Sequence, residues 1–220
     1  MIPLTQDRSF FVWGVVFLVF HAFYCVTAIA TGTPQSCLWF CVTLVLLFGI
    51  GLITENVLLV SSVVSSGFFL NLPLVIDLLA HRFAGKILIG SGAYVLDLTP
   101  FGYAVTFYHV FLLSVPVWAV FRLRRFDRWA WAVSSGHYLA LSLLTLALVD
   151  ASSDVNYVRE ATDLAGAYAM KPEGMPYWLF HWLMMTFVLI LPGHVLFRVL
   201  VYLWARLRGG RLNEGRAADA

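Results

Sequence analysis

Acidic residues within or beside apolar stretches are the groups in this sequence best suited to chemistry. Glu55 stands in a long apolar run, and Asp150 and Asp154 follow another run, four residues apart. A charge at the centre of a bilayer costs at least about 2.5–3.5 kcal/mol, so carboxyl groups placed there are functional candidates. Burial also raises the pKa of a carboxyl group, which lets it hold a proton near neutral pH. The predicted catalytic residues are therefore Asp150, Asp154 and Glu55, acting as proton donor and base.

Each acid also has a structural explanation, and both are kept open. Asp150 and Asp154 could mark the end of a helix in water. Glu55 could lie in a turn if the chain reverses at residues 54–56. Asp77 and His81, four residues apart, could form a solvated pair at a helix end.

Aromatic residues make up 16% of the chain and suggest a binding pocket. Aromatic rings stabilise cations and line apolar pockets, although belts at the membrane interface explain many of them. The predicted substrate-binding set combines such rings with one acid and one histidine: Asp97, Phe101, Tyr103, Tyr108, His109, Tyr168, Trp178 and Trp182.

The histidine and cysteine spacings do not suggest a metal or cofactor site. The six histidines show no zinc-like local spacing, and the sequence has no P-loop or Rossmann glycine pattern. We predict no metal and no cofactor. A b-type haem held between helices, with His21 and His109 at suitable depths, is the alternative to ordinary hydrogen-bonded interface histidines.

Composition identifies the class of protein. Of 220 residues, 61% are hydrophobic and 12% are charged, whereas soluble domains have about 45–50% and 25%. A chain of this length cannot bury so much apolar surface in water. This excludes a soluble globular protein and a basic nucleic-acid-binding domain. Residues 1–220 are predicted to form a single all-α transmembrane helical bundle.

Apolar runs of about 20 residues are long enough to cross the bilayer. The run 37–79 would span about 65 Å as one helix, so a break is needed, and we place it at the Ser/Gly cluster 61–67. Pro73 is expected to kink the helix that follows. The predicted helices are 10–31, 37–60, 67–80, 103–123, 129–149 and 176–204.

Six crossings are expected, with seven as the alternative. The Gly-rich segment 81–102 is interpreted as interfacial or re-entrant. The connection 150–175 is longer than helical bundles need, and we expect it to fold back as a cap over a pocket. Arginine clusters at 122–128 and 206–216 predict that both termini are cytoplasmic. We expect an integral protein of a bacterial inner membrane.

The order of several motifs resembles that of integral-membrane carotenoid 1,2-hydratases. The motifs are Glu55, the run Pro100-Phe101-Gly102-Tyr103, the pair Asp150 and Asp154, and Gly174-Met175-Pro176-Tyr177-Trp178 with Trp182. The architecture is also similar to that of integral-membrane terpene cyclases. The resemblance implies acid–base chemistry on a polyene.

The sequence therefore predicts a membrane enzyme that cyclises or hydrates an isoprenoid or another lipophilic substrate. Its expected partners are that small molecule and membrane lipid, with no nucleic acid. The alternatives are a non-enzymatic accessory subunit or lipid- or pigment-binding protein, and a b-type haem or quinone electron-transfer protein.

Overall fold

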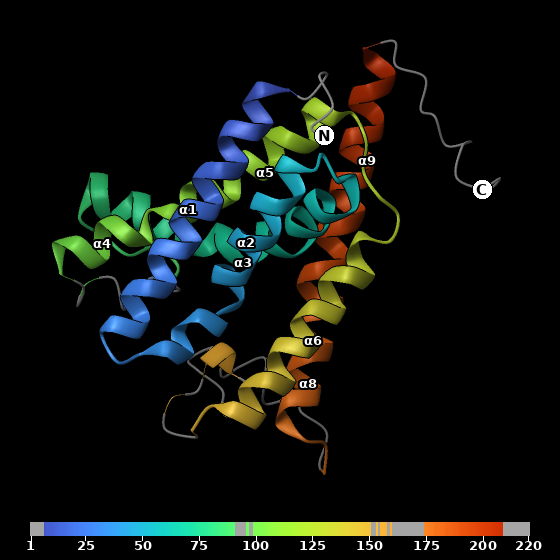
Figure 1. Cartoon of the computed structure of the whole chain (residues 1–220). Helices are drawn as coiled ribbons and strands as arrows, with labels where there is room; N and C mark the ends of the chain where they lie inside the picture. Colours follow the sequence, from blue (N-terminus) through green and yellow to red (C-terminus); the bar gives the residue numbers. More distant parts are fainter. Residues whose placement is uncertain are drawn as a thin grey trace.

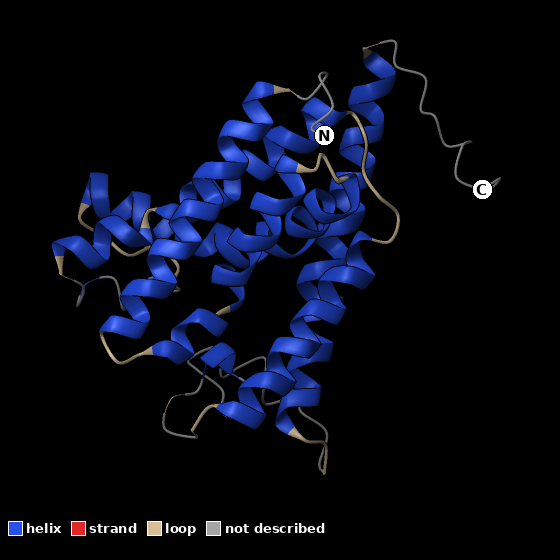
Figure 2. Ribbon diagram, viewed as in Figure 1, coloured by secondary structure: helices blue, strands red, loops and turns tan. Residues whose placement is uncertain are grey.

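The chain is described from a computed structural model, in which residues 7–90, 96, 99–150, 153, 155–157, 159 and 174–208 are placed. Within these residues every regular element is a helix, as Figure 2 shows. The all-α fold class is confirmed.

The helices vary in length from one turn to seven or more. In chain order they are α1 (Arg8–Ala30), η1 (Pro34–Leu38), α2 (Phe40–Ile53), α3 (Val57–Ala84), α4 (Pro100–Thr106), α5 (Tyr108–Leu123), α6 (Ala130–Leu148), η3 (Val155–Tyr157), α8 (Tyr177–Met184), the π-helix η4 (Met185–Ile190) and α9 (Leu191–Leu207).

Five helical segments are long and apolar enough to cross a membrane: Arg8–Ala30, Val57–Ala84, Gly102–Leu123, Ala130–Leu148 and Tyr177–Leu207. The apolar helix α2 has 14 residues and is about 21 Å long, less than the roughly 30 Å hydrocarbon core. A polytopic membrane protein is thus supported, while the sixth crossing stays a prediction.

The predicted break at residues 61–67 is wrong, because the chain reverses at residues 54–56 instead. Glu55 adopts a left-handed backbone conformation there (φ 49°). The side chain of Asn56 then accepts a hydrogen bond from the N–H of Leu59 at 3.1 Å, which caps the start of α3. Helix α3 runs without interruption to Ala84, with Pro73 inside it.

The serines that suggested a turn are buried in α3. The hydroxyls of Ser62, Ser65 and Ser66 each donate to the carbonyl four residues earlier, at 2.7–2.9 Å. Their small size leaves the backbone of α3 accessible to neighbouring helices. In α6, the hydroxyl of Ser134 donates to the carbonyl of Ser62 at 2.7 Å. In α9, Gly193 lies against the carbonyl of Ser65. Small residues allow such close approaches between membrane helices.

The outer surface of the bundle is apolar. On α1, Val12, Val19 and Val26 are each more than half exposed and lie seven residues apart, so they share one helix face. The opposite side of α1 packs on α2 through Gly14 and Gly49, where a Cβ on Gly14 would meet the Gly49 carbonyl at 2.9 Å. A helix with an exposed apolar face and a small-residue packing face suits a lipid environment.

One end of the bundle gathers the start of α1, the α2–α3 turn and the end of α5. The N–H of Asp7 donates to the Glu55 carboxylate at 2.9 Å, and Nε of Arg122 donates to the Asp7 carboxylate at 3.2 Å. The N–H of Ser9 and the Arg122 guanidinium lower the pKa of Asp7 below its usual value. This end lies at the top of Figure 1, and α8 lies at the bottom.

Two predicted features are described only in part. In the segment 81–102, α3 continues to Ala84 and ends at Gly85 in a left-handed conformation, and residues 91–95, 97 and 98 are not described. Most of the predicted cap, 150–175, is not described either.

Replacing Gly193 with alanine is expected to destabilise the protein by about 1–3 kcal/mol, as overpacking does. The added Cβ would lie 2.6 Å from the Ser65 carbonyl oxygen, and backbone on both sides limits relaxation. The measurement is thermal unfolding in detergent. Gly136→Ala in α6 is the matched control, because nothing lies within 4 Å of its Cβ position and alanine favours the helix. Equal melting temperatures for the two variants would contradict the close packing of α9 on α3.

Candidate functional site

A hydrogen-bonded polar cluster lies where α6, α8 and η3 meet, at the end of the bundle away from the start of α1 (Figure 1). We call Tyr138, Tyr177, His181 and Asn156 the tyrosine–histidine cluster. Tyr138 is 2% exposed and His181 is 5% exposed. Both side chains are therefore shielded from the surroundings of the bundle.

The cluster is connected through the imidazole of His181. Its Nε2 lies 2.6 Å from the Tyr138 hydroxyl, and its Nδ1 lies 3.5 Å from the Tyr177 hydroxyl. Tyr138 donates its hydroxyl hydrogen to the backbone carbonyl of Asn156 at 3.1 Å. In that arrangement Nε2 carries the imidazole proton and donates to Tyr138, while Nδ1 is the acceptor. A proton can then enter the ring at one nitrogen and leave from the other.

Asn156 fixes the cluster to the start of α2. Its Oδ1 accepts from the N–H of Phe40 at 2.7 Å, and its Nδ2 donates to the carbonyl of Leu38 at 2.8 Å. The N–H of Phe40 belongs to the first turn of α2, where no intrahelical partner exists. Asn156 itself has φ 60°, a conformation that asparagine tolerates better than most residues.

A second polar group extends the cluster along α6 and α8. The hydroxyls of Ser135 and Thr186 are 2.7 Å apart. The indole Nε1 of Trp182 lies 3.0 Å from both the carbonyl and the hydroxyl of Ser135. Trp182 is therefore held with its ring against α6 at Ser135, about one helical turn from Tyr138.

Helix α8 continues into a π-helix rather than a regular α-helix. The π-helical residues Met185–Ile190 precede Pro192, which has no N–H to donate and whose ring would clash with the carbonyl four residues earlier. A widened turn accommodates such a residue, and π-helical turns occur often at functional sites. Here the wide turn carries Thr186 toward Ser135.

Aromatic rings pack beside Tyr138. Phe40 packs edge-on against Tyr138 with ring centroids 4.9 Å apart, and His137 lies 5.1 Å from the same phenylalanine ring. Nδ1 of His137 is buried and has no hydrogen-bond partner within the described part of the chain. The site therefore combines π-faces with groups that can give or take a proton.

The C-terminal end of α6 is capped by a cation. The Arg159 guanidinium donates to the backbone carbonyls of Thr145, Leu146, Val149 and Asp150 at 2.6–3.5 Å. The carbonyls of Leu146 and Val149 lie at the C-terminal end of α6, where helices lack internal donors. The Asp150 side chain is exposed at this helix end, and Asp154 lies outside the described residues.

Glu55 lies at the other end of the bundle from the tyrosine–histidine cluster. It is partly buried in the α2–α3 turn, where it accepts the N–H of Asp7. This is the alternative placement that the sequence left open for it.

Asp77, in α3, is the fully buried carboxyl group among the described acids. It is 0% exposed and accepts from the N–H groups of Leu88 and Ile89 at 2.9 and 2.7 Å. Asp77 is thus not part of a solvated pair with His81. The His81 ring lies 5.6 Å from that of Tyr103. The two hydrogen bonds to Asp77 hold Leu88 and Ile89, which follow α3, against that helix.

The predicted substrate-binding residues lie on different elements. Tyr103 in α4 donates to the Leu78 carbonyl at 3.1 Å, and His109 in α5 donates from Nδ1 to the Thr106 carbonyl, 2.9 Å away. Tyr108 packs on His109 with centroids 4.0 Å apart. Of the set, the structure places Trp182 beside the tyrosine–histidine cluster.

Trp178 lies in α8 and is partly buried. Phe101 belongs to α4, but its side chain is not described, and Asp97 and Tyr168 are outside the described residues.

Sequence reasoning missed the residues at the centre of the cluster. Tyr138, His181 and Asn156 belong to no local motif, and the bond from Phe40 to Asn156 joins residues 116 positions apart. Pro192 inside the last apolar run was a usable signal, because a proline within a helix predicts a local departure from α-helical geometry.

The chain matches no protein-family model, no curated protein and no solved structure. The resemblance to carotenoid 1,2-hydratases and membrane terpene cyclases therefore stays a prediction.

Asn156 offers a direct stability test of this end of the bundle. Asn156→Gly keeps the left-handed backbone and loses both side-chain hydrogen bonds, so it is expected to cost about 1–3 kcal/mol. Asn156→Ala should cost about 1 kcal/mol more, because alanine disfavours that backbone conformation. Thermal unfolding in detergent measures the order of stability of the original protein and the two variants. A glycine variant as stable as the original protein would show that the bonds to Leu38 and Phe40 contribute nothing.

Proposed function

We propose that this protein is an integral-membrane enzyme that performs acid–base chemistry, a cyclisation or a hydration, on an isoprenoid or another lipophilic substrate. The observation that carries the proposal is the buried Tyr138–His181 pair, 2.6 Å apart in an apolar bundle. A buried pair of proton-handling groups beside an aromatic ring supports proton transfer to or from an apolar molecule.

The proposed reaction begins when a carboxylic acid protonates a carbon–carbon double bond and leaves a carbocation. In a cyclisation, a second double bond attacks the cation, and the final cation loses a proton to His181. In a hydration, water attacks and its proton passes to His181. Asp154, two residues before Asn156 in the sequence, remains the proposed donor. Asp150 is given no part, because its side chain is exposed at the end of α6. Glu55 is given no part, because it lies at the other end of the bundle.

The rings near the cluster have a second role in this proposal. The faces of Tyr138, Trp182 and Phe40 would stabilise the cation, since the negative face of an aromatic ring attracts positive charge. The positions of Phe40 against Tyr138 and of Trp182 against Ser135 support this role. Tyr138 would also hold the imidazole of His181 in one orientation.

We also propose six crossings, with both termini cytoplasmic in a bacterial inner membrane. The support is that the start of α1 and the ends of α5 and α9 share one end of the bundle, through the Asp7–Arg122 pair and the groove that Arg122 shares with Arg208. Arginines at that end agree with the positive-inside rule.

The proposed activity is tested with the full chain in nanodiscs, a panel of linear polyprenyl alcohols and hydrocarbons, and D₂O as solvent. Protonation from an exchangeable acid adds deuterium to carbon, which mass spectrometry detects in the product. His181→Gln is expected to lower the rate by about 10²–10⁴-fold, the usual contribution of a general acid or base. Tyr138→Phe removes only the hydroxyl that orients the imidazole and is expected to lower the rate less.

Tyr202→Phe is the matched control, because this tyrosine is 42% exposed on α9. Melting temperatures of all variants separate loss of chemistry from loss of fold. Full activity in both cluster variants would contradict the assignment of the site. If no polyene acquires deuterium with the original protein, the non-enzymatic lipid-binding alternative replaces the proposal.

The topology has its own test in fusion reporters. A reporter after residue 208 and one inserted in the connection 150–175 should report opposite sides of the membrane, because one helical pass, α8 to α9, separates them. The same side for both would contradict the crossing by Tyr177–Leu207.

A further inference from the structure

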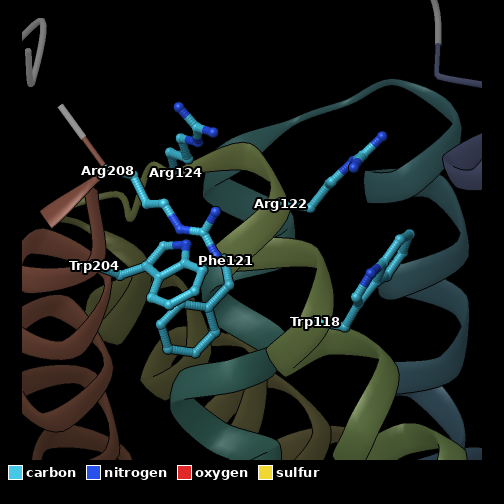
Figure 3. Close-up of a pocket in the computed structure, with 6 residues that line it drawn as sticks. All are labelled: Trp118, Phe121, Arg122, Arg124, Trp204 and Arg208. Atoms are coloured by element: carbon cyan, nitrogen blue, oxygen red, sulfur yellow. The ribbon is translucent and has the colours of Figure 1, made fainter. Parts of the chain in front are cut away.

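An open groove lies between the C-terminal ends of α5 and α9, far from the tyrosine–histidine cluster. It encloses about 460 Å³. Figure 3 shows three arginines at its rim and three aromatic rings in its walls. We call it the arginine–tryptophan groove; its residues are Trp118, Phe121, Arg122, Arg124, Trp204 and Arg208.

The guanidinium groups of the groove use only some of their N–H groups in the contacts described within the protein. Arg208 lies over the Trp204 ring, with its guanidinium carbon 4.6 Å from the ring centroid. Arg122 uses Nε to bind Asp7, and its side chain is 61% exposed, so its terminal nitrogens face outward. Arg124 is exposed in the left-handed position that ends α5. All three arginines are exposed and line the same groove.

The walls of the groove are apolar and fixed. Trp204 packs edge-on against Phe121, with centroids 5.9 Å apart. Trp118 packs edge-on against Phe10 of α1 at 5.3 Å. Both tryptophans are still more than a third exposed. A large ring that is anchored on one side and open on the other can contact an acyl chain.

We propose that the arginine–tryptophan groove binds the headgroup of an anionic phospholipid. The phosphate would accept N–H groups from Arg124, Arg208 and the free nitrogens of Arg122, since arginine forms forked bonds with phosphate oxygens. The acyl chains would lie against Trp118 and Trp204, along helices whose outer faces are apolar. Basic pockets between membrane helices, close to the interface, recognise such headgroups.

The arrangement favours a lipid over a soluble anion. The guanidinium groups lie at the end of two spanning helices, where headgroups are concentrated, and the aromatic walls continue from the charged rim toward the apolar part of the bundle. A free phosphate would leave those walls without a partner. The proposal does not depend on the proposed enzymatic function.

Tryptophan quenching by brominated lipids tests the proposal with the full chain in phosphatidylcholine nanodiscs. Brominated phosphatidylglycerol should quench at a several-fold lower mole fraction than brominated phosphatidylcholine. The chain has eight tryptophans, so Trp118→Phe with Trp204→Phe identifies the signal from the groove. Arg124→Gln with Arg208→Gln should abolish this preference, because each arginine near the membrane surface contributes about fivefold to the binding of an anionic lipid.

Arg128→Gln is the matched control. Arg128 follows α5 and lies over a tryptophan, Trp129, at 5.6 Å, but it is not part of the groove. The proposal is overturned if the phosphatidylglycerol preference survives the double arginine variant, or if Arg128→Gln reduces it equally. It is also overturned if excess inorganic phosphate abolishes the preference at constant ionic strength, because the site would then take free phosphate. Selective loss in the double arginine variant, with folding confirmed by thermal unfolding, supports it.

Discussion

The approach of α6 and α9 to the serine-lined face of α3 is the constraint on which the bundle depends. The Ser62 carbonyl accepts the hydroxyls of both Ser66 and Ser134, and Gly193 reaches the Ser65 carbonyl. In a lipid environment, burying apolar side chains between helices gains little, so close packing and hydrogen bonds decide which helices associate. A larger residue at any of these positions would separate the helices and remove both kinds of contact.

This packing also determines where the polar cluster can form. Ser135 and Tyr138 follow Ser134 within about one turn of α6. The bond from Ser134 to α3 therefore fixes their position along the helix axis and the side of α6 on which they lie. In the last span, Pro192 precedes Gly193, and the π-helix lies directly before both. The wide turn that carries Thr186 to Ser135 is therefore held in register by the contact of Gly193 with α3.

The sequence predicted most of the helices because long apolar runs are visible without any alignment. It misplaced one break because serine and glycine clusters mark turns in water-soluble proteins. Within an apolar helix, a serine hydroxyl instead bonds to the carbonyl four residues earlier and needs no water. The true break carried a weaker signal, Asn56 as the cap of α3 and Glu55 in a left-handed turn. A residue able to cap a helix, Asn56, was thus a better predictor of the break between α2 and α3 than the cluster of serine and glycine residues.

The candidate site was harder to predict because candidates were chosen by the free-energy cost of inserting a side chain into the membrane, and this cost is highest for charged residues. That ranking favours carboxyl groups such as Glu55 and Asp150, yet these avoid the cost by lying in a turn and at a helix end. A neutral imidazole or phenol costs far less to bury when it is hydrogen-bonded. His181 and Tyr138 can therefore be buried without any local sequence signal, held by partners that only the tertiary fold supplies. In a bundle of this kind, proton-handling groups are found more reliably from mutual hydrogen bonds than from the insertion cost of single residues.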